Sequence, residues 1–516
     1  MTAPKPAEFP RQRSAAVYSI ASNAGVNPSP TPGSADQTGG VSAAGRTNML
    51  FNSDVFLRFF AAFLLLYYLV RGHRAWRNVL IVGASYLFYG WWDYRFLSLL
   101  FLSSVVDYSV GRKLAVTEDP ARRKLWLGLS LVVSLGLLGF FKYCNFFVES
   151  FAAVLAQLGL SASPPVLNVV LPVGISFYTF QSMSYAIDVY RRRLPATRSF
   201  VEFLAFVSFF PQLVAGPIER ASNLLPQFQR PRVITSAMVG EGVWLMLWGM
   251  FKKVVLADNL APLVEQAYHP GVHSGPVIVL GTIAFAFQIY GDFSGYSDIA
   301  RGLAKILGFE LMVNFNLPYG ASSLREFWHR WHVSLSTWLR DYLYVSLGGN
   351  RRGAVRTRLN LLVTMVLGGL WHGAAWNFVL WGLWHGAGLA VTRRDRRVAG
   401  TAPLPGWRRG IAWGLTAAFV LYGWLLFRAG SFSEVVRLTT SLGRLEWPVW
   451  IGSYALNLVV FSLPLVLVQI WQARAGDLLA PARLPLVPRA LLQGALLGAV
   501  ILYWEKQASP FIYFQF

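Results

Sequence analysis

Long apolar runs recur along this sequence, and they constrain the fold more than any other feature. A helix rises about 1.5 Å per residue, so about 20 apolar residues cross the roughly 30 Å hydrocarbon core of a bilayer. Several runs are shorter than about 18 residues, which fits tilted or re-entrant segments. The runs are Phe59–Val70, Asn78–Trp92, Phe96–Val110, Leu125–Phe141, Val166–Ile187, Gly242–Leu256, Val277–Tyr290, Leu359–Leu383, Ile411–Phe427, Leu456–Ile470 and Ala490–Tyr503. They are continuous rather than alternating, and predict an all-α polytopic membrane protein with roughly ten to twelve helical spans, not a β-barrel.

The charge balance supports the same class. Hydrophobic residues make up 55% of the chain and charged residues only 14%, whereas soluble proteins carry about 25%. The net charge is +22, but the basic residues cluster between apolar runs, which is the positive-inside pattern of cytoplasmic loops. These clusters are Arg71–Arg77, Arg112–Lys124, Arg191–Arg193, Arg351–Arg358 and Arg393–Arg397. A second interpretation is that the loops attract an anionic donor or an acidic carrier protein. We expect a lipid bilayer, and no nucleic acid, as the chain's surroundings.

The first 48 residues differ from all that follows. Residues 1–48 are rich in Ala, Ser, Pro, Gly and Thr and contain no apolar run, so they predict a disordered extension. They also lack the apolar core of a signal peptide. The membrane domain is expected to cover residues 49–516, and Met49 could be the true initiator.

His372 is the most informative single residue. It is the middle residue of Leu361–Leu383, inside a stretch from Leu359 to Thr392 without an acidic residue, lysine or arginine. A titratable ring in such surroundings is costly, and it usually faces a cavity, pairs with another group or does chemistry. The alternative is a core histidine satisfied by a carbonyl group or by Asn377. Because glycines crowd this position, Gly373 among them, we expect a funnel or a helix break to expose the ring.

Other histidines lie nearby in the sequence. His329 and His332 are three residues apart and would share a face of a helix over Trp328–Trp338. That helix could equally be an interfacial one with tryptophans as belt anchors. His385 follows His372 by 13 residues, about 140° around a continuous helix. The two rings would not share a site unless the helix breaks, so we expect His385 to be structural.

The remaining polar residues give weaker signals. For Arg340-Asp341, and for Asp292 and Asp298, structural ion pairing is favoured over catalysis. Metal binding is weakly signalled, since there is no His-Glu-x-x-His motif and no Cys/His cluster with zinc spacing. Nucleophile-elbow and phosphate-loop motifs are absent as well. A histidine alone can still take the proton from an acceptor hydroxyl as it attacks a thioester, with a rate gain of about 10²–10⁴.

Together, several segments of the chain resemble the membrane-bound O-acyltransferase family. The resemblance is to the bacterial branch that serves alginate O-acetylation and D-alanine export to Gram-positive walls, and it covers nearly everything from Met49 to Phe516. Val345-Ser346 departs mildly, where relatives often carry Ile-Pro. The segments that carry it are Met49–Phe60, Phe140–Phe147, Leu171–Phe177, Phe210–Ile218, Asp292–Asp298, Glu326–Asn350, Gly369–Gly382 and Phe511–Phe516.

The resemblance implies a ring of tilted helices around a central funnel, with acetyl groups passing from a cytoplasmic donor toward an extracytoplasmic polysaccharide, such as alginate or cellulose. His372 would be the general base or would orient the acceptor. His332, rather than His385, would be its neighbour in space and would position or polarise the thioester or a downstream acyl carrier. Cavity-lining or substrate-binding support would come from Trp371, Asn377, Arg340 and Asp341. No bound cofactor or metal is implied. Acetyl-CoA is the expected donor, and periplasmic acetyltransferases and polysaccharide synthase machinery are the expected partners at the bacterial inner membrane.

Two other functions stay open at this point. One is D-alanyl transfer from an acidic carrier protein on the same fold. The other is a transporter or channel whose histidines relay protons.

Overall fold

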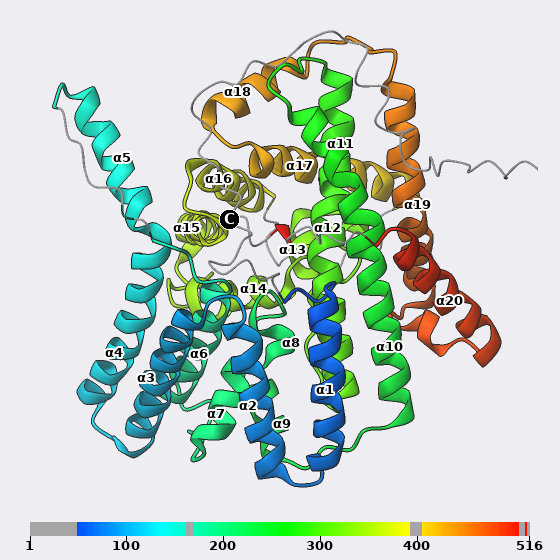
Figure 1. The fold of residues 1–516 in the computed structure, drawn as a ribbon. Coiled ribbons are helices and arrows are strands. Elements are labelled where there is room, and N and C mark those ends of the chain that lie inside the picture. The colour runs from blue at the N-terminus through cyan, green and yellow to red at the C-terminus, as the bar shows by residue number, and fades with distance from the viewer. Residues whose placement is uncertain (1–48, 161–166, 168, 393–404, 505–510, 513–516) are drawn as a thin grey trace, which may run out of the picture. The chain divides into compact units, whose positions relative to one another are not determined.

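The computed structural model describes residues 49–160, 167, 169–392, 405–504 and 511–512. Every regular element in these ranges is helical (Figure 1), which confirms the all-α class. The predicted disordered extension, residues 1–48, lies outside the described residues, as does the basic cluster at Arg393–Arg397. The extension and its boundary at Met49 therefore stay predictions.

Four helical segments are long and apolar enough to cross a bilayer by length and composition. They are the continuous segment Pro120–Gln157 and the helices α12 (Gly275–Ile306), α17 (Gly406–Arg428) and α19 (Ile451–Ala475). The helix α20 (Leu486–Leu502) is shorter but also apolar. The chain is thus a multi-pass membrane protein, and the count of ten to twelve spans stays a prediction.

The N-terminal helices form one packed group (Figure 1). Ser53 caps the N-terminus of the first helix, because its hydroxyl accepts a hydrogen bond from the Phe56 amide at 3.1 Å. The group comprises α1 (Asp54–Val70), α2 (Arg74–Gly90), α3 (Leu97–Val116), α4 (Pro120–Leu138), α6 (Ile175–Tyr190), α7 (Phe200–Ser208), α8 (Phe210–Leu213) and α9 (Ala221–Gln229). Between α4 and α5 (Cys144–Gln157) the helix widens into one π-helical turn over Gly139–Tyr143.

A second group surrounds α12. It contains α10 (Ser236–Met250), the π-helical turn Phe251–Ala257 and α11 (Asp258–Tyr268). Charged residues here are buried in pairs, since the Lys253 ammonium lies 2.7 Å from Asp292 and that of Lys252 lies 2.6 Å from Asp298. These contacts confirm that Asp292 and Asp298 are ion-paired, as a charge inside a membrane protein requires.

The segment after α12 is made of short pieces. Ser323 caps the start of α13 (Leu324–Arg330) by accepting from the Glu326 amide, and the Glu326 carboxylate accepts from the amide of Ser322. The chain then breaks before α14 (Val333–Trp338) and the π-helical turn Leu339–Tyr344. The prediction of one helix over Trp328–Trp338 is therefore wrong, because Trp331 is extended and His332 is left-handed.

The uncharged stretch folds into an antiparallel hairpin of two helices, α15 (Gly353–His372) and α16 (Trp376–Val391), which lie side by side in Figure 1. Glycine permits their close approach, since a Cβ on Gly382 would lie 2.4 Å from the Met365 carbonyl oxygen. The α18 helix (Phe432–Ser441) and short 3₁₀ turns at Tyr94–Phe96, Pro318–Gly320 and Ala480–Arg483 complete the described elements.

Candidate functional site: two buried imidazoles at a helix break

His372 is the last residue of α15. The next residue, Gly373, has φ −160° and ψ 150°, so the chain leaves the helix in an extended conformation and re-enters one at Trp376. A Cβ at position 373 would lie 2.1 Å from the Phe378 ring, so the turn needs glycine. This geometry confirms the predicted helix break beside the histidine.

Aromatic rings enclose the His372 imidazole, which is only 6% exposed. Trp381 of α16 and Phe427 of α17 meet it edge-to-face, with ring centroids at 5.1 Å and 5.3 Å. Trp371 completes the enclosure at 5.1 Å. Such walls fix the ring orientation and exclude bulk water, which strengthens electrostatic interactions with a reacting group.

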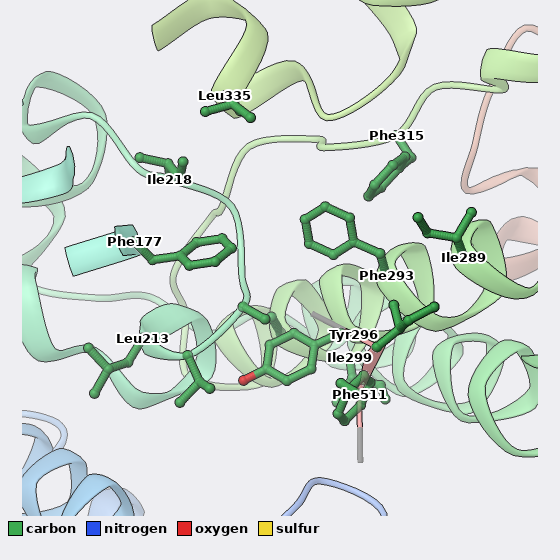
Figure 2. Close-up of a cluster of buried hydrophobic side chains, with 14 of the residues drawn as sticks. Phe177, Leu213, Ile218, Ile289, Phe293, Tyr296, Ile299, Phe315, Leu335 and Phe511 are labelled. Atoms are coloured by element: carbon green, nitrogen blue, oxygen red, sulfur yellow. The ribbon is translucent and has the colours of Figure 1, made fainter. Parts of the chain in front are cut away.

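His332 lies between α13 and α14 and is fully buried. Its backbone has φ 41° and ψ 54°, a left-handed conformation that residues with a side chain seldom adopt. The Phe293 ring meets the imidazole edge-to-face at 4.7 Å, with Phe315 at 6.4 Å and Phe177 at 6.5 Å. Figure 2 shows these three phenylalanines in the buried apolar cluster that also contains Tyr296 and Phe511.

The two imidazoles come together at the centre of this enclosure. Their ring centroids are 6.5 Å apart, and Trp371 touches both, at 5.8 Å from His332. The prediction that His332 is the neighbour of His372 is therefore confirmed. Trp371 thus packs against both imidazoles, and its role as a cavity-lining residue stays a prediction.

Asn314 determines which nitrogen of His332 carries the proton. Its Oδ1 accepts from the backbone amide of Ser334 at 3.2 Å and from the Ser334 hydroxyl at 2.9 Å, while its Nδ2 donates to Ser297 at 3.3 Å. These contacts fix the amide orientation. The His332 Nδ1 lies 3.1 Å from the same Oδ1, so Nδ1 carries the hydrogen and donates it. In the neutral ring, Nε2 then holds the lone pair that can accept a proton.

The other two histidines of this region serve elsewhere. His385 packs among Trp328, Trp381 and Phe419, at 4.9 to 5.6 Å between ring centroids. His329 is exposed, and its Nδ1 lies 2.6 Å from the Arg325 carbonyl oxygen, one helical turn earlier. Both contacts are structural, as expected for His385.

Asn377 lies close to the hairpin turn but faces α17. Its amide donates to the carbonyl oxygens of Ala429 at 2.8 Å and Phe427 at 3.4 Å, the carbonyls at the C-terminal end of that helix. Its observed contacts make it a capping residue, and it reaches the site indirectly, since Phe427 is one wall of the His372 enclosure.

Arg340 and Asp341 form a separate ion-pair cluster. The Asp341 carboxylate lies 2.7 Å from Arg340 and 3.0 Å from Arg220, and its backbone carbonyl accepts from Arg191. Burial opposes ionisation of Asp341, but the two guanidinium groups outweigh it and lower the pKa of the carboxyl. The ion pairing favoured from the sequence is therefore present, and the cavity-lining or substrate-binding role that the resemblance implies for these two residues stays a prediction.

Two residues at the site were missed by sequence reasoning. Asn314 gave no signal, because one asparagine in a polar loop carries no spacing information. Lys142 did give a signal that was not used, because it is a lysine at the end of an apolar run. Its ammonium donates to the carbonyl oxygens of Trp371 and His372.

The fold and the site together define a helical membrane protein with two imidazoles at a helix break inside its apolar interior. The family model for membrane-bound O-acyltransferases matches residues 188–431, which include both imidazoles. The chain is 45% identical over 398 residues to "Probable alginate O-acetylase AlgI" of Azotobacter vinelandii, covering 76% of this chain and 78% of that protein. It is 33% identical over 425 residues to a peptidoglycan O-acetyltransferase of Helicobacter pylori, covering 76% and 79%.

A third relative is more distant. A teichoic acid D-alanyltransferase of Streptococcus thermophilus is 28% identical over 316 residues, covering 55% of this chain and 75% of that protein. This chain belongs to the membrane-bound O-acyltransferase family, and it is an O-acyltransferase.

Proposed function

We propose that this chain transfers acetyl groups toward O-acetylation of an extracytoplasmic polysaccharide, from within the bacterial inner membrane. The observation that carries the proposal is the pair of buried imidazoles 6.5 Å apart. The names of the more similar relatives support acetyl as the group transferred, at 45% and 33% identity against 28% for the D-alanyltransferase. The polymer is alginate or another exopolysaccharide.

In the proposed reaction the acceptor hydroxyl attacks the carbonyl carbon of an acetyl thioester. His372 takes the hydroxyl proton as the new ester bond forms. The carbon–sulfur bond then breaks, and the leaving thiolate takes up the proton from His372, which returns to its neutral form. His332, whose Nδ1–H is held by Asn314, positions the acyl group or shares the proton through Nε2. Trp371 keeps the two rings in place.

Acetyl-CoA is the proposed donor, approaching from the cytoplasmic side where basic loops gather. Periplasmic acetyltransferases would receive the group and pass it to the polymer made by the synthase machinery. Aromatic rings enclose both imidazoles, among them Trp381 and Phe427 around His372 and Phe293 beside His332, which supports transfer through a partner protein rather than directly to a polymer.

The test is His372→Ala, with membrane insertion checked by immunoblot and the O-acetyl esters of the exopolysaccharide measured chemically. We expect the ester content to fall by about 10²-fold or more, the contribution of a general base. His329→Ala, at an exposed histidine on α13, is the matched control and should leave the ester content unchanged. Wild-type acetylation in the His372→Ala strain would reject the catalytic assignment. Labelled D-alanine, rather than labelled acetate, in the polymer would favour the D-alanyl alternative.

A further inference from the structure

The end of α15 needs hydrogen-bond partners from outside the helix. The last four carbonyl groups of any helix have no N–H donor within that helix. Inside a membrane protein, water cannot supply the missing donors. The chain turns extended at Gly373 and provides no helical continuation. The carbonyls of the residues that carry the imidazole therefore depend on other side chains.

Two neighbouring side chains supply these partners. The Lys142 ammonium donates to the Trp371 carbonyl oxygen at 2.7 Å and to that of His372 at 3.1 Å. The Tyr143 hydroxyl donates to the Leu370 carbonyl oxygen at 2.8 Å. Three consecutive carbonyls at the end of α15 are thus capped by two consecutive residues of another helix.

The π-helical turn between α4 and α5 places both donors there. Lys142 and Tyr143 are the last two residues of this turn, which spans Gly139–Tyr143. A π turn inserts a residue into the helical register and often occurs at functional sites. Three residues beyond the turn, Phe146 contacts Trp376 at the start of α16, with ring centroids 5.5 Å apart. The turn and the start of α5 therefore contact both sides of the helix break.

Charge favours this position for a lysine. A cation is stabilised at the negative C-terminal end of a helix dipole. The ammonium also lies 5.9 Å from the centroid of the Trp371 ring, within cation–π range. The hydrogen bonds of the ammonium go to the carbonyl oxygens of Trp371 and His372, at this end of α15. The negative end of the α15 dipole therefore stabilises the positive charge of Lys142.

We propose that Lys142 is a positioning residue for acyl transfer, and that its ammonium caps the C-terminal end of α15 and fixes the backbone from which His372 and Trp371 project. This inference rests on the proposed role of His372. It predicts that the positive charge and its donors matter, not the length or hydrophobicity of the side chain. A small displacement of a reacting group costs about 10²-fold in rate.

The experiment compares Lys142→Met, Lys142→Arg and the matched control Lys124→Met, an exposed lysine on α4. Full-length protein is measured in two ways. Hydrogen exchange of peptides covering residues 366–378 reports the cap without reference to catalysis, and O-acetyl esters of the exopolysaccharide report function.

For Lys142→Met we expect faster exchange in these peptides and an ester content below about a tenth of wild type. Lys142→Arg keeps a cation with several donors, so it should restore at least half of the ester content. The Lys124→Met protein should match wild type in both measurements. If Lys142→Met does not accumulate in the membrane, Lys142→Gln, which keeps one donor and loses the charge, takes its place under the same criteria.

Three results would overturn the proposal. One is a wild-type ester content in Lys142→Met, and another is unchanged exchange over residues 366–378. The third is a Lys142→Arg protein with wild-type exchange but no activity, because the lysine amine would then act chemically. An active His372→Ala protein rejects the proposed function instead, and the exchange data still decide whether Lys142 caps the helix.

Discussion

Asn314 organises the site at the scale of a single residue. Its backbone carbonyl oxygen accepts from the Val333 amide at 2.9 Å, and its side-chain Oδ1 accepts from His332 and Ser334. The left-handed backbone of His332 costs on the order of 1 kcal/mol or more, and such strain persists only where the surroundings over-determine it. Asn314 therefore stabilises the strained backbone of His332 and also fixes the tautomer of its imidazole.

Replacing this residue tests the tautomer argument. Asn314→Leu has a similar size and removes the acceptor, so the His332 ring loses the group that fixes Nδ1–H. We expect the rate of acyl transfer to fall toward that of His332→Ala, by up to about 10²–10⁴-fold. Asn314→Asp keeps an oxygen acceptor and should lose much less. The measurement is polymer O-acetylation at matched membrane levels.

A control separates this effect from the loss of any buried amide. Asn360 is equally buried and donates to the carbonyls of Leu347 and Gly349, away from the imidazoles. Asn360→Leu should lower thermal stability more than it lowers activity per folded molecule. Equal activity losses in Asn314→Leu and Asn314→Asp would contradict the tautomer argument.

Single residues were predictable where their surroundings were unusual. His372 stands out because no charge lies within a 34-residue stretch around it, from Leu359 to Thr392. Asn314 does not stand out, because its importance comes from contacts with residues 18 and 20 positions further along the chain. Such contacts depend on tertiary folding, which no local pattern encodes.

At the scale of elements, the hairpin of α15 and α16 sets the position of His372. The two helices approach closely because glycines face the opposite backbone, as Gly382 faces Met365 and Gly369 faces Phe378. The helix break was predictable from the glycines around the histidine. The break at Trp331 was not, since aromatic and polar residues alternate there in a way that also fits one amphipathic helix.

Gly382→Ala tests this close approach. Its added methyl group would lie 2.4 Å from the Met365 carbonyl oxygen and 2.8 Å from the Val366 Cα, both backbone atoms that cannot move cheaply. We expect the free energy of unfolding to fall by about 1–3 kcal/mol, with a loss of activity as the end of α15 shifts. Thermal unfolding in detergent micelles measures the first effect.

The matched control is Gly414→Ala on α17, where nothing lies within 4 Å of the added carbon. Alanine is the better helix former by up to about 1 kcal/mol, so this variant should be as stable as wild type or slightly more so. If both variants melt alike, the two helices are not held by glycine contact.

At the scale of the whole molecule, the membrane class was predictable and the interior was not. Uncharged runs report burial in lipid directly, because charges are costly there. They do not distinguish a spanning helix from a short or broken one, so the number of spans and the irregular segment around Asn314 could not be derived. That segment is held by long-range contacts, among them one from Glu219, in the loop between α8 and α9.

Glu219 makes the stability of this scaffold depend on pH. The side chain is fully buried, accepts from the Met312 amide at 2.5 Å and from Asn223 at 2.7 Å, and thereby ties its loop to the segment that carries Asn314. Burial raises the pKa of Glu219 from 4.5 to about 7, despite these hydrogen bonds. Between these two values the folded state binds more protons than the unfolded state, so stability falls as pH rises. The stabilisation from the protonated Glu219 carboxyl is fully present below the unfolded pKa and is lost as the pH rises through about 7. Its full size is at most on the order of 3 kcal/mol.

Glu219→Gln removes this titration while keeping a carbonyl oxygen for the Met312 amide. The wild-type unfolding temperature in detergent should therefore decline from pH 5 to pH 7.5 more steeply than that of the variant. Glu149→Gln, at an exposed glutamate on α5, should keep the wild-type slope. Parallel slopes for wild type and Glu219→Gln would show that the carboxyl ionises as readily in the folded protein as in the unfolded chain. Because Glu219 and the imidazoles are linked through the Asn314 segment, the same variant should also weaken the pH dependence of acyl transfer over this range.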